Sequence, residues 1–131
     1  MELLQLENII TAKLKVMVPR LTNGKYPHMS FTNEISEQTP SFPNVYIHEL
    51  EPSEVGRDLA NDQIHALRYT IQIEVSTNTG KNDARIVVNA CIRAMKSLKY
   101  SLVSGPTHIK VNNINRFVIR VRRIVANGDE L

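Results

Sequence analysis

The sequence predicts an α+β fold, a two-layer sandwich in which two helices cover one face of a mixed or antiparallel sheet of about five strands. Strict alternation of apolar and polar residues from Leu67 to Val75 is typical of a strand with one buried face. Apolar stripes at helical spacing, near residue 1 and after Asp83, indicate two amphipathic helices. The predicted order along the chain is α, β, β, β, α, β, β.

The length of 131 residues is typical of one domain, so residues 1–131 are predicted to form a single domain with a short flexible C-terminus. An apolar fraction of 42% and a charged fraction of 22% argue against disorder. No apolar run approaches the roughly 20 residues that span a bilayer, and residues 1–6 lack the features of a secretory signal. We therefore expect synthesis in the cytosol and no membrane insertion.

The first helix is predicted from apolar residues at steps of three and four, namely Leu3, Leu6, Ile10, Leu14 and Met17. Pro19 is expected to end this helix, because proline has no N–H to donate within it. Residues 20–27 favour turns, and residues 28–35 are expected to be extended. After a polar loop with two prolines, another strand is expected to begin near Asn44.

Residues 51–66 are predicted to project from the body as a loop or β-arm, because the stretch is longer than a usual hairpin connection. It carries Arg57 and several acidic residues, namely Glu51, Glu54, Asp58 and Asp62. It also contains the apolar residues Val55, Leu59 and Ile64, which have a role in an arm that contacts a partner and little role in a loop exposed only to solvent. A loop folded back on its own domain is the alternative.

The second helix is predicted over residues 83–98, with Asn82 as its cap. Its apolar stripe consists of Ala84, Val87, Val88, Cys91, Met95 and Leu98. Gly105 and Pro106 are expected to separate a short strand over residues 101–104 from the last strand, which includes residues 117–122. The alternation slips at Arg122 and Arg123, which suggests a bulge there.

No residue pattern predicts catalysis, a cofactor or a metal site. The histidines are far apart and lack ligand spacing; they are His28, His48, His65 and His108. Cys91 lies in an apolar helical stripe, where a cysteine is expected to be a core residue and not a nucleophile. The five glycines are isolated, which excludes a P-loop. We expect a protein that is not an enzyme; a small ligand-binding module or an enzyme is the alternative of another class.

The strongest functional candidate is a row of arginines in the last strand. Period two places Arg116, Arg120 and Arg122 on one face, which could contact phosphates or acidic groups of a neighbouring subunit. A solvated outer face is as well supported as the subunit contact, and DNA contact is less favoured because aromatic residues for stacking are few. The net charge of +3 decides little, because sixteen basic and thirteen acidic residues are spread along the chain.

The order of these segments resembles the tail terminator proteins of tailed phages and the related tail completion and head–tail joining proteins. The resemblance lies in the segment FPNVYI at residues 42–47 before a polar loop, YTIQIEVSTN at residues 69–78 after it, and a helix that begins shortly afterwards. An amphipathic N-terminal helix is also shared, so the resemblance covers almost the whole chain.

The resemblance implies a structural virion protein that assembles in the host cytoplasm and needs no cofactor. It implies a homo-oligomeric ring, typically of about six copies, that caps the head-proximal end of the tail tube and ends tube polymerisation. The implied partners are the tail tube protein and the head–tail connector protein, and DNA would pass through the lumen without specific recognition. The arm at residues 51–66 and the arginines of the last strand would then contact neighbouring subunits or the tube. A head–tail connector or a tail tube component is the alternative of the same class.

Overall fold

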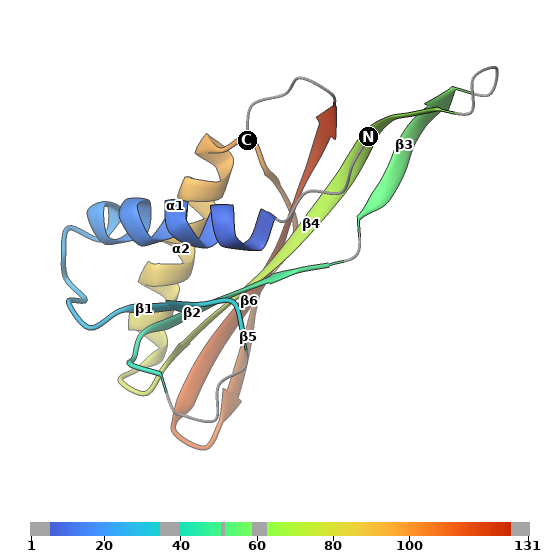
Figure 1. Cartoon of the computed structure of the whole chain (residues 1–131). Coiled ribbons are helices and arrows are strands. Elements are labelled where there is room, and N and C mark those ends of the chain that lie inside the picture. Colours follow the sequence, from blue (N-terminus) through green and yellow to red (C-terminus); the bar gives the residue numbers. More distant parts are fainter. Residues whose placement is uncertain (1–5, 35–39, 51, 59–62, 127–131) are drawn as a thin grey trace.

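A computed structural model describes residues 6–34, 40–50, 52–58 and 63–126, and at 53–58 and 63–65 it describes the backbone alone. Two helices, α1 (Leu6–Leu21) and α2 (Lys81–Ser97), lie on one face of a six-stranded sheet (Figure 1). The strands are β1 (Ser30–Thr32), β2 (Asn44–Glu49), β3 (Ser53–Asp58), β4 (Gln63–Thr77), β5 (Ser101–Val111) and β6 (Ile114–Ala126). The predicted α+β class is confirmed.

The sheet is mixed, and its main path contains five strands in the order β1-β2-β4-β6-β5. Strand β1 is parallel to β2, and the other pairings are antiparallel. Strand β4 is central, because it pairs with β2 on one side and with β6 on the other; Ile73 faces both Ile47 and Ile119. Strand β3 lies off this path and also pairs with β4.

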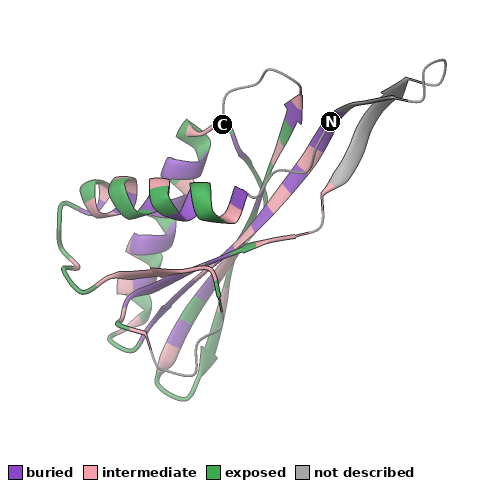
Figure 2. Ribbon diagram, in the orientation of Figure 1, coloured by how far each residue is buried: buried purple, intermediate pink, exposed green. Residues whose placement is uncertain are grey.

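The hydrophobic core lies between the helices and the inner face of the sheet, as the alternating bands of burial on the strands indicate (Figure 2). The alternation predicted for β4 holds, since Tyr69, Ile71, Ile73 and Val75 are fully buried. Burying each such side chain contributes roughly 1.5–3 kcal/mol relative to exposure. No helix within the described ranges is long and apolar enough to cross a membrane.

Helix α1 was expected to end at Pro19, but it continues to Leu21. A proline in the last turn removes a single backbone hydrogen bond, and Val18 beside it is fully buried against the core. The helix is closed instead by a bond of 2.9 Å from the Gly24 N–H to the Pro19 carbonyl oxygen. Leu3, predicted for the apolar stripe, lies outside the described residues.

Helix α2 begins at Lys81, so Asn82 is not its cap. Gly80 occupies the cap position, and no side chain there bonds the first amides. Asp83, in the first turn, instead accepts hydrogen bonds from Thr79 Oγ1 at 2.7 Å and from the Tyr26 hydroxyl at 2.9 Å. The start of α2 is therefore fixed to the loop after α1 by side chains.

The predicted break at Gly105 and Pro106 is wrong, because β5 continues through both residues. Its irregularities fall at two register shifts, after residue 102 and after residue 104. The bulge predicted at Arg122 and Arg123 is also wrong, since the pairing of β6 with β4 is unbroken there. Arg123 lies on the inner face of the sheet, where its Nη1 donates to the Leu98 carbonyl oxygen at 3.4 Å. Inner and outer residues therefore alternate regularly here, although the sequence has a polar residue at an inner position.

The segment predicted as a loop or β-arm contains β3 and the start of β4, paired antiparallel. This β-arm extends away from the helical layer (Figure 1). Val55 pairs with Ala66, and Arg57 pairs with Ile64. Leu59, together with the C-terminal residues 127–131, lies outside the described residues.

Candidate functional site

The sheet face opposite the helices carries the arginines that the sequence singled out. Because β4 and β6 pair in unbroken register, Arg116, Arg120 and Arg122 lie on one face, and all three are exposed. No helix covers this outer face (Figure 2). The predicted row is therefore a surface feature of the sheet.

Two of the three arginines are held by partners on β4. Arg116 donates from Nε to Ser76 Oγ at 3.2 Å and lies 3.6 Å from Glu74 Oε1. Arg120 donates from Nε to Gln72 Oε1 at 3.0 Å. Exposed contacts of this kind contribute about 0.2–1 kcal/mol each, so they orient the side chains more than they stabilise the fold. The side chain of Arg122 has no hydrogen bond or ion pair within the described part of the chain.

A fourth arginine, Arg68, lies on the same face and was missed in the sequence. It faces Ile124 across the β4–β6 ladder, next to the pair formed by Thr70 and Arg122. Its Nε is buried without a hydrogen-bond partner among the described residues. The alternation in β4 already indicated that Arg68 lies on the polar face of that strand. Only the register between β4 and β6 shows that it lies beside Arg122.

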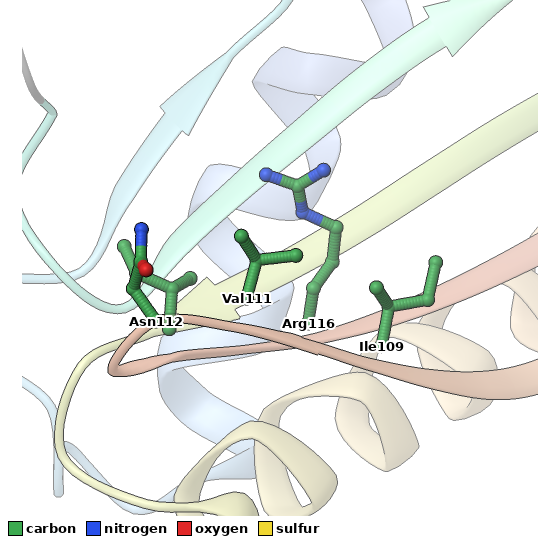
Figure 3. A pocket seen from close by; sticks show the side chains of 5 residues that line it. Ile109, Val111, Asn112 and Arg116 are labelled. Carbon is green, nitrogen blue, oxygen red and sulfur yellow. The ribbon is translucent and has the colours of Figure 1, made fainter.

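A small apolar pocket opens beside the β5–β6 turn (Figure 3). The side chains of Ile109, Val111 and Arg116 rise from the same side of the hairpin. The pocket has a volume of about 180 Å³, and Asn112 and Ile114 complete its lining. Val111 is 61% exposed, on a strand that forms one edge of the sheet. An exposed apolar edge of this kind suits an extended segment of another chain.

A second, basic hollow lies at the other end of β6. It is lined by Lys99, Ser101, Arg122, Arg123 and Ile124, and its volume is about 390 Å³. Three lining residues are cationic, and none of the five is acidic. Sequence reasoning missed this site because Lys99 comes from the end of α2 and Ser101 from the start of β5.

The end of α2 explains how Lys99 reaches the basic hollow. The N–H of Tyr100 donates to Met95 O at 2.9 Å and that of Lys99 to Lys96 O at 3.0 Å, which is the Schellman pattern. Lys99 occupies the left-handed position of this motif, with φ at 72°. The helix terminus therefore fixes the backbone from which the ammonium group extends.

The predicted arm residues and the apolar pocket are far apart along β4. The β-arm includes the end of β4 at Gln63, whereas Thr77 at the other end pairs with Asn115 next to the β5–β6 turn. Of the arginine row, Arg116 lies at the pocket end, whereas Arg122 pairs with Thr70 toward the arm, where Arg68 pairs with Ser53 of β3. The β-arm and the apolar pocket lie at opposite ends of the sheet (Figure 1).

The groups with intrinsic reactivity do not gather in a site. Cys91 is fully buried, and burial raises the pKa of its thiol to about 12, so the thiol stays protonated at neutral pH. His108 contacts Asn115 through Nε2 at 2.9 Å, and His48 Nδ1 lies 3.7 Å from Glu7 Oε1. Across the described residues, no group of three or more potential ligands could hold a metal ion.

A scan of the chain against models of protein families found no match, and a search of curated proteins returned no relative. Function is therefore inferred from the surfaces of the chain itself.

Proposed function

We propose that this protein is a structural, non-enzymatic tail terminator of a tailed phage. In this proposal several copies, about six, close into a ring on the head-proximal end of the tail tube. The ring ends tube polymerisation and presents a surface to the head–tail connector protein. DNA passes through the lumen without sequence-specific contacts.

The observation that carries the proposal is the placement of two unlike surfaces at opposite ends of one sheet. The β-arm extends from one end, and the apolar pocket with the exposed edge of β5 lies at the other. A contact between unlike surfaces of identical chains is heterologous, so it continues from copy to copy until it closes as a ring or grows as a filament. A cap that must end growth requires the closed outcome.

The arginine row fits a role between protein subunits better than a role in reading DNA. Arg116 and Arg120 are already oriented by Ser76, Glu74 and Gln72, and a positioned guanidinium suits a fixed carboxylate partner. Nucleic-acid surfaces that stack bases use exposed aromatic rings. On the outer face, the aromatic residue near the row is Tyr46, half-buried on β2 and 6.2 Å from the ring of His48. We therefore assign Arg116 and Arg120 to contacts with neighbouring copies or with the tube.

The test is the native mass of the purified protein, followed by negative-stain imaging of the same sample. Closed rings of about six copies are expected. Long tubes would identify a tail tube component instead. A strict monomer that also fails to bind isolated tail tubes would contradict both readings and favour a ligand-binding module.

A further inference from the structure

The basic hollow near the end of β6 is lined by three cationic side chains and by no acidic one. Lys99, Arg122 and Arg123 line it together with the Ser101 hydroxyl and Ile124. The side chains of Lys99 and Arg122 form no hydrogen bond or ion pair with other described residues, whereas those of Arg116 and Arg120 do. The hollow therefore contains two cationic side chains, Lys99 and Arg122, whose donors can bind a ligand.

Two further observations concern the neighbourhood and the lining of this hollow. Arg68 faces Ile124 across the ladder, and its buried Nε has no partner in the described part of the chain. Lys99 occupies a left-handed position that favours glycine, so a cation stands where the backbone prefers no side chain.

We propose that this hollow binds a phosphate group. Its donors come from three segments, namely the residue two positions after α2, the start of β5 and the end of β6, so several parts of the chain can contact one ligand. A carboxylate is planar and satisfied by one guanidinium, whereas a phosphate offers oxygens in several directions and up to two negative charges. The three cations and the hydroxyl of the hollow therefore suit a phosphate better than a carboxylate. The site does not depend on ring formation.

The test is calorimetric titration of the full chain with pyrophosphate at about 100 mM salt, where weak surface attraction is screened. Saturable binding of one pyrophosphate per chain is expected. Arg122→Gln should weaken binding about tenfold, because it removes a charge-assisted pair. Arg120→Gln is the matched control, since Arg120 lies on the same strand and face but outside the hollow; it should change the Kd less than about twofold.

The outcomes separate the phosphate site from general basicity. Absence of saturable binding, or equal weakening by both variants, would overturn the proposal. Citrate binding more tightly than pyrophosphate would also overturn it, in favour of a carboxylate partner. A short DNA duplex that competes with pyrophosphate would support the site and identify nucleic acid as the source of the phosphate. Pyrophosphate binding that DNA does not disturb would support the site with a small phosphate compound as its ligand.

Discussion

The Tyr26 hydroxyl donates a hydrogen bond of 2.9 Å to Asp83 Oδ1, across 57 positions of sequence. The same carboxylate accepts from Thr79, so one acidic side chain fixes the start of α2 to the loop that follows α1. The bonds from Thr79 and Tyr26 hold the pKa of Asp83 below its usual value. Packing alone does not set the position of the two helices.

The first prediction concerns the pH dependence of this contact. A carboxylate whose pKa is lowered by folding stabilises the protein above its unfolded pKa of about 3.9, and that stabilisation is lost as the pH falls through the lower folded pKa. Asp83→Asn should therefore lower the free energy of unfolding at pH 7 and have a smaller effect below about pH 4. Urea denaturation at both pH values measures the difference, and an equal effect at both would contradict it.

Tyr26→Phe tests the other partner of the same bond. Removing the hydroxyl should lower the free energy of unfolding by about 0.5–1.5 kcal/mol at pH 7. Tyr46→Phe is the matched control, because the Tyr46 hydroxyl has no hydrogen-bond partner among the described residues; a change under about 0.5 kcal/mol is expected. Similar losses in both variants would show that the bond between Tyr26 and Asp83 contributes nothing specific.

The regular parts of this fold were predictable because they depend on local periodicity. Period two in β4 and steps of three and four in α2 record which side of each element is buried, and the structure buries those sides. The arginine face was predictable for the same reason. Arg116, Arg120 and Arg122 alternate with buried residues, and a strand has only two faces.

The features that were missed depend on partners distant in sequence. Arg123 seemed to interrupt the alternation because it is a charged residue at an inner position. The Leu98 carbonyl oxygen, just after α2, accepts a hydrogen bond from its guanidinium there, and the sequence does not show that contact. Residues 105 and 106 suggested a break, yet they fall at a register shift inside one continuous strand, and the pairing with β6 resumes between Thr107 and Val118. The basic hollow combines residues from three elements, and only tertiary structure shows that Lys99 lies beside Arg122.

The second prediction tests Gly105 in the edge strand. Its φ is +91°, and a Cβ there would collide with the Val118 carbonyl oxygen and lie 3.1 Å from Ile119 Cα. Gly105→Ala should therefore lower the free energy of unfolding by about 2–4 kcal/mol, since backbone strain and a steric clash add. Gly24→Ala, at φ +68° with nothing within 4 Å of a Cβ, should cost only about 1 kcal/mol. Equal costs, measured by thermal denaturation, would mean that β5 shifts freely away from β6.

The third prediction tests the β5 edge as a subunit contact. Val111→Asp replaces an apolar side chain on the wall of the pocket with a charged one and should shift rings toward monomers in native mass measurements, because removing a carboxylate from water at a subunit contact opposes association. Val16→Asp is the control: Val16 is 52% exposed on α1, against 61% for Val111 on β5. A ring that persists in Val111→Asp, or dissociates equally in both variants, would place the subunit contact elsewhere.

The fourth prediction sets stability against binding at Lys99. Glycine adopts the left-handed position without steric cost, so Lys99→Gly should raise the free energy of unfolding by about 0.5–1 kcal/mol. The same change removes one of the three cations of the basic hollow and should weaken pyrophosphate binding. Lys96→Ala is a suitable control, since Lys96 is an exposed cation in the last turn of α2 that does not line the hollow. A variant that becomes more stable and binds pyrophosphate more weakly would show that the lysine lowers stability at this backbone position and contributes its charge to binding. Unchanged pyrophosphate binding would show that Lys99 does not contribute to the basic hollow as a ligand-binding residue.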